Sequence, residues 1–151
     1  MQCYQWQPFF IFVFPKSLFH GKDKITMKIK GIARDCLEGI KASAKELHPR
    51  EFLALLSLGN SKDIITELVL LPQMVYGRRH ATFNIYMAPF DRRIVGTVHS
   101  HPSGSAEPSE GDLHTFQKHG RVHIIIAYPY EDDTWKAYDY NGNEIHLEIV
   151  D

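Results

Sequence analysis

Short apolar runs separated by turn residues constrain the fold of this 151-residue chain most strongly. The runs are five to eight residues long, the usual length of β-strands, and none approaches the roughly 20 residues that span a bilayer. A core built from several short strands is therefore expected. The predicted strands are Phe52–Leu58, Ile64–Leu71, Phe83–Met87, Ile94–Ser100, Val122–Tyr128, Thr134–Tyr140 and Glu144–Val150.

Two stretches of the chain are expected to be helical. Apolar residues recur at steps of three and four over about Gly31–Leu47, and His48-Pro49 ends this amphipathic pattern. A second, shorter helix is expected over Ser109–Lys118 and is stopped by Gly120.

The Asn141-Gly142 pair lies between two alternating runs near the end of the chain. This is the strongest short-range signal for a β-hairpin. The order of elements is then helix, several strands, helix, strands, which predicts a mixed α+β domain with mostly antiparallel pairing.

The composition narrows the class of protein. With 44% apolar and 23% charged residues the chain has ordinary globular usage, and 151 residues suffice for about one domain. Seventeen basic against eighteen acidic residues leave a net charge of -1, which disfavours a general nucleic-acid binder. Cys3 and Cys36 are too few for a disulfide framework or a cysteine zinc site. A cytoplasmic protein without membrane contact is expected.

The first 26 residues differ from the rest of the chain. Met1–Thr26 carries three Lys and one Asp, whereas Met27–Asp151 carries 14 basic and 17 acidic residues. The apolar stretch Phe9–Phe14 is short, and no Lys or Arg precedes Lys16, unlike a secretory signal. We expect an N-terminal extension, from a misplaced start codon, ahead of a domain over 27–151; the alternative is an added element that packs on the domain through Trp6.

Two histidines end the predicted strand Ile94–His101. Residues two apart in a strand share a face, so Val95, Thr97, His99 and His101 are expected in one row with both imidazoles at its carboxyl end. Neighbouring neutral imidazoles suit a divalent metal, zinc above all. Without further ligands, two such histidines on one strand are more often ordinary surface residues than metal ligands.

A carboxylate follows at the start of the second predicted helix. Ser109 and Asp112 are three residues apart and share a face there. The same spacing is a capping box, which is the commoner reading of an isolated motif. If Asp112 joins His99 and His101 as a ligand, the fourth tetrahedral position stays open for water, as in catalytic zinc sites. Glu51, taken alone, passes as an exposed charge before a strand.

Taken together, these residues indicate one kind of site much more specifically than any of them does alone. His99-Ser100-His101, seven residues, Ser109, two residues and Asp112 resemble the signature of the JAMM (MPN+) metalloprotease family. Pro102 matches the proline after the second histidine, and Glu51 matches the family's upstream glutamate. The resemblance extends over nearly all of residues 27–151 and is greatest to the small stand-alone archaeal deubiquitinase-like members.

The resemblance implies a fold, a cofactor and a mechanism. The fold is the cytidine-deaminase-like MPN fold, a curved, mostly antiparallel sheet flanked by two helices. Zn²⁺ is held by His99, His101 and Asp112. Glu51 acts as general acid and base during hydrolysis of an amide by activated water, and the Ser109 hydroxyl donates to the developing oxyanion.

The resemblance also implies the partners. The scissile amide follows the C-terminal tail of a ubiquitin-like modifier or sulfur-carrier protein, and Thr82–Met87 is the candidate edge for strand addition by that tail. The short link from Gly120 to Val122 predicts little discrimination between chain linkages. Two alternatives remain. A RadC-like DNA-repair-associated protein would bind DNA in a salt-sensitive way, and a non-catalytic MPN scaffold would take up no zinc.

Overall fold

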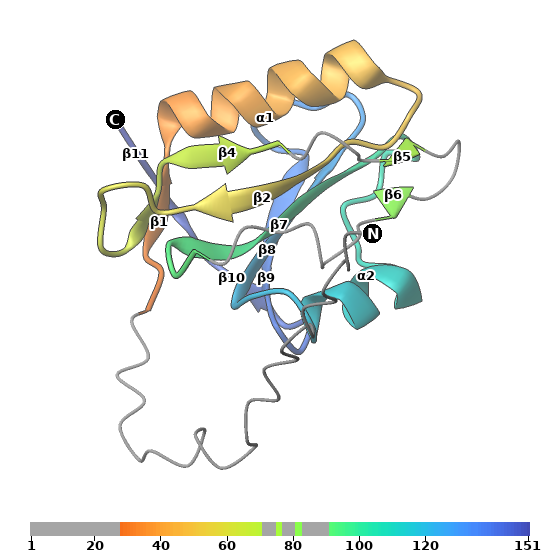
Figure 1. Ribbon diagram of the computed structural model, residues 1–151. Helices are drawn as coiled ribbons and strands as arrows, with labels where there is room; N and C mark the ends of the chain where they lie inside the picture. Colours follow the sequence, from red (N-terminus) through yellow and green to blue (C-terminus); the bar gives the residue numbers. More distant parts are fainter. Residues whose placement is uncertain (1–27, 71–74, 77–80, 83–90) are drawn as a thin grey trace, which may run out of the picture.

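The computed structural model describes residues 28–70, 75–76, 81–82 and 91–151 (Figure 1). The predicted extension Met1–Thr26, the predicted strand Phe83–Met87 and nearly all of the candidate edge Thr82–Met87 lie outside these residues. The elements are β1 (Gly31–Ala33), α1 (Arg34–Leu47), β2 (Leu53–Ser57), β3 (Ile64–Ile65), β4 (Glu67–Val69), β5 (Val75–Tyr76), β6 (Ala81–Thr82), β7 (Ile94–His101), α2 (Glu110–Phe116), β8 (Val122–Ala127), β9 (Trp135–Asp139), β10 (Glu144–Ile145) and β11 (Glu148–Val150).

A six-stranded sheet forms the centre of the fold. Its strand order is β10-β9-β8-β7-β2-β4, and its pairs are antiparallel except for β7 with β8. Helix α1 runs across the sheet along one side, and the shorter α2 lies on the other side near the carboxyl end of β7 (Figure 1). The expected mixed α+β architecture with mostly antiparallel pairing and two helices is confirmed.

The first helix begins later than the sequence predicts. The periodicity suggests a start at Gly31, but Gly31–Ala33 forms β1, which pairs in parallel with β11 and with β3. These partners come from distant parts of the chain, and local periodicity carries no information about them. Helix α1 then begins at Arg34 without a side-chain cap and ends before His48, as predicted.

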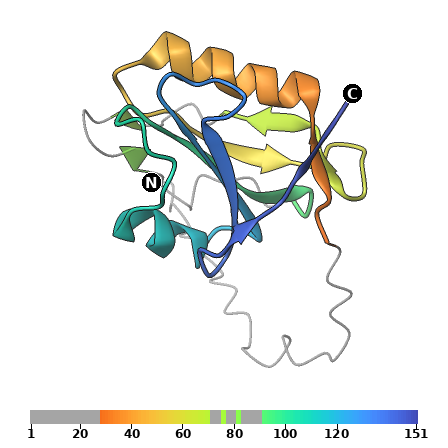
Figure 2. The same ribbon diagram turned by 180° about the vertical axis from the view of Figure 1, so that it is seen from behind.

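Two predicted strands each divide between two sheets. Ile64–Leu71 becomes β3, which pairs with β1, and β4, which pairs with β2. Glu144–Val150 becomes β10, which completes the predicted hairpin with β9, and β11, which crosses behind the sheet to reach β1 (Figure 2). The second helix is also shorter than predicted, ending at Phe116 instead of Lys118.

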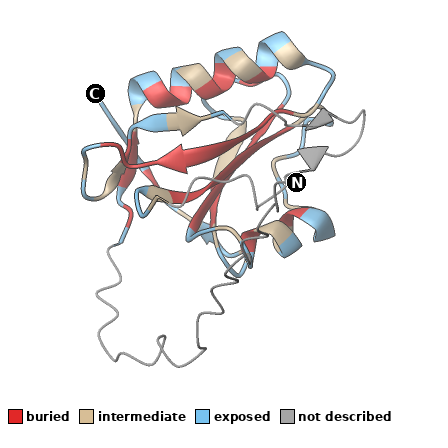
Figure 3. Ribbon diagram, in the orientation of Figure 1, coloured by how far each residue is buried: buried red, intermediate tan, exposed pale blue. Residues whose placement is uncertain are grey.

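The two faces of the six-stranded sheet bury different clusters, and strands β2, β7 and β8 are buried along most of their length (Figure 3). The larger cluster lies between the sheet and α1 and includes Val98, Ile124 and Tyr130. It also includes Val95. Strict alternation along the strand predicts Val95 on the same face as His99 and His101, but the register between β2 and β7 shifts at this point, so Val95 belongs to the α1 side. The smaller cluster joins Phe116, Ile125 and Tyr138 beneath α2. No helix among the described residues is long and apolar enough to cross a bilayer.

Gly96 allows β7 and β8 to approach closely. A Cβ atom at this position would lie 1.5 Å from the carbonyl oxygen of Val122, so the two strands could not keep their spacing. We expect Gly96→Ala to lower the free energy of unfolding by about 3 kcal/mol, at the upper end of the usual cost of overpacking. Urea unfolding followed by circular dichroism measures this loss.

Gly39 provides the matched control. It lies in α1, and a Cβ atom there would make only an ordinary contact, 3.6 Å from the nearest Leu68 methyl carbon. Because alanine favours a helix interior over glycine by about 1 kcal/mol, Gly39→Ala should leave stability unchanged or raise it slightly. Equal losses in both variants would contradict the close approach at Gly96.

Candidate metal centre

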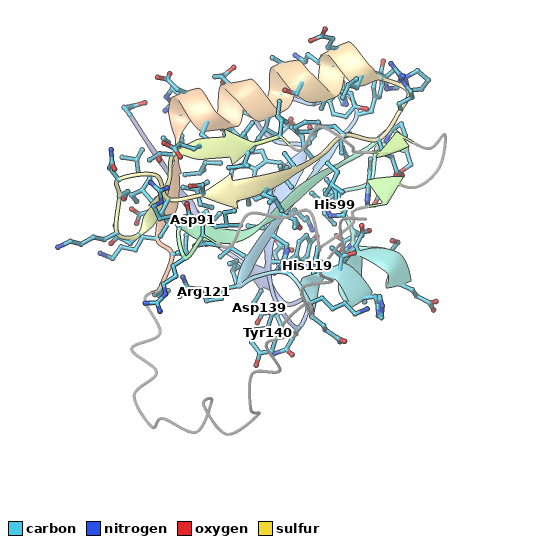
Figure 4. All side chains as sticks on the ribbon, in the orientation of Figure 1. Asp91, His99, His119, Arg121, Asp139 and Tyr140 are labelled. Carbon is cyan, nitrogen blue, oxygen red and sulfur yellow. The ribbon has the colours of Figure 1, made fainter. Side chains whose placement is uncertain are left out.

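Strand β7 directs both candidate histidines toward α2. His99 lies opposite Leu53 of β2 and beside Ile125 of β8, and Ile125 belongs to the cluster beneath α2. Since residues two apart share a face, His101 lies on this face as well. His99 is seen near the end of β7 that faces α2 (Figure 4). The imidazoles are largely buried, with side-chain exposures of 10% and 13%.

Glu51 is held opposite His101 on the same face. The amide of Phe52 donates to the Ser100 hydroxyl at 2.7 Å, and the amide of Ser100 donates to the Phe52 carbonyl at 2.9 Å. These bonds extend the β2–β7 register by one residue beyond the Leu53–His99 pair, which aligns Glu51 with His101. Glu51 is half-buried, and its charge contributes to raising the pKa of His101.

Asp112 and Ser109 form a complete capping box at the start of α2. The Ser109 hydroxyl accepts from the Asp112 amide at 3.2 Å, and the Ser109 amide donates to Asp112 Oδ2 at 2.7 Å. The Ser109 hydroxyl also donates to Oδ2 at 2.7 Å. The capping interpretation of the spacing is thus confirmed, and it places the buried Asp112 carboxylate on the face that carries the histidines.

The Asp112 carboxylate contacts both imidazoles. Its Oδ1 lies 3.2 Å from His99 Nδ1, and its Oδ2 lies 3.2 Å from His101 Nε2. On its other side, His101 Nδ1 lies 3.0 Å from the Ser105 carbonyl oxygen. A carbonyl can only accept, so this contact fixes a proton on Nδ1 and leaves Nε2 to face the carboxylate.

The charge balance of this cluster favours a cation. Burial opposes ionisation of Asp112, but hydrogen bonds from His101, His99 and Ser109 outweigh it and hold the pKa of that carboxyl well below its usual range. Burial likewise opposes a charged His101, yet its hydrogen bond to Asp112 and their mutual attraction raise the pKa of that imidazole. A buried carboxylate facing two imidazole nitrogens is satisfied either by a proton or by a metal cation between them.

The residues present fit a zinc ion. Two imidazoles and a carboxylate are ligands that zinc prefers, and His99 Nε2 is buried without a hydrogen-bond partner. The Asp112 carboxylate lies 3.2 Å from one nitrogen of each imidazole, so the three side chains are near enough to share one ion. Among the described residues no group of three or more His, Cys, Asp or Glu is already arranged as a metal site. The cluster is therefore two imidazole–carboxylate contacts that share Asp112, and ligation requires a local adjustment of these side chains.

A third histidine lies beneath the site. His123 is fully buried, its Nδ1 is 2.9 Å from the Thr97 hydroxyl, and its ring stacks on Phe116 with centroids 4.2 Å apart. Phe116 also meets His99 edge-on at 6.4 Å. In the sequence, His123 shows no spacing typical of a metal ligand. It is a core residue, although its Nε2 has no hydrogen-bond partner.

Acid is expected to destabilise the fold through His123. Burial is the main cause that lowers the pKa of this imidazole to about 3, whereas the unfolded chain binds a proton near 6.5. Around and below pH 6.5 the unfolded state therefore binds more protons, and the free energy of unfolding should fall by about 1.6 kcal/mol between pH 6.5 and 5. Denaturant unfolding with chelator present, so that metal release does not contribute, measures this slope. His123→Gln should give a flatter profile, and a parallel profile would contradict the assignment.

Relatives of known family match most of this chain. Residues 33–139 match the family of prokaryotic homologues of the JAB domain. A protein of Haloferax volcanii named a probable metalloprotease is 37% identical over 132 residues, which cover 82% of this chain and 81% of that protein. The chain therefore belongs to the JAMM/MPN family, as a prokaryotic JAB homologue.

Solved structures with JAMM or JAB1/MPN in their descriptions are similar to this chain. One, described as JAMM, a metalloprotease-like zinc site in the proteasome and signalosome, is similar with a TM-score of 0.65 at 41% identity, covering 82% of this chain and 100% of that one. A JAB1/MPN domain protein of Archaeoglobus fulgidus is similar with a TM-score of 0.63 at 43% identity, covering 80% and 97%. The resemblance inferred from the motif and the fold class that it implies are confirmed. The roles assigned to individual site residues stay predictions.

Proposed function

We propose that the chain is a zinc-dependent peptidase or isopeptidase that cleaves the amide bond after the C-terminal tail of a ubiquitin-like modifier or sulfur-carrier protein. The observation that supports this most is the alignment of Glu51 with His101 beside the His99–Asp112–His101 cluster. Similarity to a probable metalloprotease and to a metalloprotease-like zinc site supports the same class of reaction.

His99, His101 and Asp112 would hold the zinc. A bound zinc ion supplies Lewis acidity, which polarises a carbonyl and lowers the pKa of water toward about 7. Ser105 and Ser109 orient two of the ligands through the contacts described above. Such supporting partners fix ring and carboxylate orientation and commonly decide metal affinity.

Glu51 moves the protons. Its carboxylate accepts a proton from the attacking water and delivers a proton to the leaving nitrogen, because an amine leaves poorly as an anion. The backbone alignment of the half-buried Glu51 with His101 supports this role, because one side chain beside the proposed ligands can serve both steps.

Ser109 has two roles to reconcile. Its hydroxyl hydrogen points to Asp112 Oδ2, so donating to an oxyanion requires the hydroxyl to rotate away from that oxygen. We expect Ser109→Ala to cost about 1 kcal/mol of stability from the lost cap and to lower kcat about 10²-fold from the lost donor. Ser109→Thr, which keeps a hydroxyl, is the control. A variant Ser109→Ala with normal kcat would leave the residue as a cap alone.

Hydrolysis of defined substrates tests the proposed function. The purified protein is incubated with a ubiquitin-like protein fused through its C-terminal tail to a reporter, and with an unrelated peptide of equal length. Cleavage at the fusion junction, loss of cleavage with chelator and recovery with zinc are expected. Absence of zinc uptake would favour a scaffold, and salt-sensitive DNA binding without cleavage would favour a RadC-like role.

A further inference from the structure

The segment that carries Glu51 is anchored at both ends. It is the short link His48–Phe52 between α1 and β2. At its far end the amide of Phe52 is bonded to Ser100 of β7. At its near end His48 Nδ1 lies 3.0 Å from the Tyr130 hydroxyl, and Tyr130 belongs to the loop that follows β8. One anchor thus comes from β7, and the other comes from the loop that follows the neighbouring strand β8.

Tyr130 is an unusual anchor. Its side chain is 1% exposed, and its backbone has a φ of 66°, in the left-handed region that bulky residues rarely adopt. Such a conformation is strained and persists only where the surroundings hold it, often next to functional sites. The His48 ring packs against both Tyr130 and Tyr128, with centroids 5.8 Å and 5.0 Å away, and the two tyrosine rings lie 5.8 Å from each other.

The loop that carries Tyr130 is tied firmly to the helix before the link. Lys41 of α1 pairs with Asp132 at 2.5 Å, and Lys45 pairs with Glu131 at 2.7 Å. The amide of Tyr128 also donates to the carbonyl of His101 at 2.9 Å. One loop therefore touches α1, the link and the histidine strand, so a shift of this loop is transmitted to all three.

Glu51 and Tyr130 are electrostatically coupled. Burial is the main cause that raises the pKa of Tyr130, and the negative charge of Glu51 adds to it. The Glu51 charge also contributes to the raised pKa of His101. The glutamate thus lies within electrostatic range of both the buried tyrosine and the site.

We propose that Tyr130 is a positioning residue for Glu51, which acts by holding His48 and thereby the start of the link. This inference rests on the proposed function of Glu51. Tyr130 packs in the cluster on the α1 side of the sheet, away from the face that carries the histidines, so it is not expected to touch substrate. Because catalysis is sensitive to displacements of about 1 Å, a loosened link lowers turnover while substrate binding is retained.

The first experiment compares variants that remove or keep the polar atoms of the contact between His48 and Tyr130. Tyr130→Phe removes only the hydroxyl that meets His48, and Tyr128→Phe, in the same loop, removes one that is not part of this contact. We expect Tyr130→Phe to lower kcat about tenfold with KM unchanged. His48→Leu should match this loss and His48→Asn, which keeps a polar atom near the Nδ1 position, should restore activity to within about threefold of wild type. Equal rates for the two tyrosine variants would overturn the proposal.

A double-mutant cycle separates positioning from general structural damage. In a Glu51→Gln background there is no carboxylate left to position, so adding Tyr130→Phe should change the residual rate less than about twofold. A merely structural role predicts the same tenfold loss in both backgrounds, and that result would contradict the inference.

Hydrogen exchange gives a readout that does not depend on activity. The amides of Arg50 and Phe52 lie in the link and are bonded to Leu47 and Ser100. Tyr130→Phe and His48→Leu should raise exchange in this segment several-fold relative to wild type, whereas Tyr128→Phe should not. Unchanged exchange overturns the inference even if the enzyme is active. An inactive wild type with the expected exchange pattern would instead overturn the proposed function.

Discussion

Glu51→Gln should lower the rate of amide hydrolysis by about 10³-fold, within the range that general acid–base catalysis contributes. Glutamine is nearly the same size and can accept a hydrogen bond, but it cannot take a proton from water at neutral pH. Zinc content should be unchanged because Glu51 is not one of the proposed ligands. Steady-state cleavage of the fusion substrate and elemental analysis measure the two quantities on the same sample.

Glu46→Gln is the matched control for this change. Glu46 is an exposed residue of α1, and its replacement removes the same charge away from the site. Its rate should stay within about twofold of wild type, since isolated surface charges contribute little. If Glu51→Gln retained full activity while binding zinc, another residue would have to move the protons and the assignment of Glu51 would be wrong.

Asp112→Asn should abolish stabilisation by zinc. In the wild type, zinc at 100 times its dissociation constant should raise the free energy of unfolding by about 2.7 kcal/mol. Asparagine keeps an oxygen for the amide of Ser109 and so preserves much of the cap, but it removes the anion that faces His99 and His101. We therefore expect almost no zinc-dependent shift and hydrolysis at the background rate.

Thermal unfolding with and without zinc measures this difference directly. Asp133→Asn, which changes an exposed carboxylate in the loop between β8 and β9, is the control and should respond to zinc like the wild type. A full zinc shift in Asp112→Asn would mean that the ion binds elsewhere, and the three-residue ligand set would have to be abandoned.

The site was easier to predict than the strand pairing, for physical reasons. His99 and His101 are related by the two-residue period of a strand, and Ser109 and Asp112 by the three-residue step at a helix start. Both periods are local, so the structure places these side chains as the spacing predicts. The position of Glu51 came from the family resemblance alone, because no local rule links it to a strand about 50 residues away.

The sequence-based predictions that the structure contradicts concern segments that pair with distant parts of the chain. The periodicity predicts a first helical turn where β1 forms, and the hairpin signal predicts a continuous second hairpin strand where β11 forms. Both segments are apolar enough for either role, and only their parallel pairing with each other decides between them. The contact between His48 and Tyr130 was missed for the same reason, since it joins two loops 82 residues apart.

One measurement tests the central claim most directly, that two imidazoles of β7 and the carboxylate of α2 share one cation beside Glu51. Crystals grown with zinc can be measured with X-rays on either side of the zinc absorption edge. A single strong anomalous peak about 2.0–2.2 Å from atoms of His99, His101 and Asp112 is expected. No peak at this position, or a peak bound only to other histidines, would contradict the account.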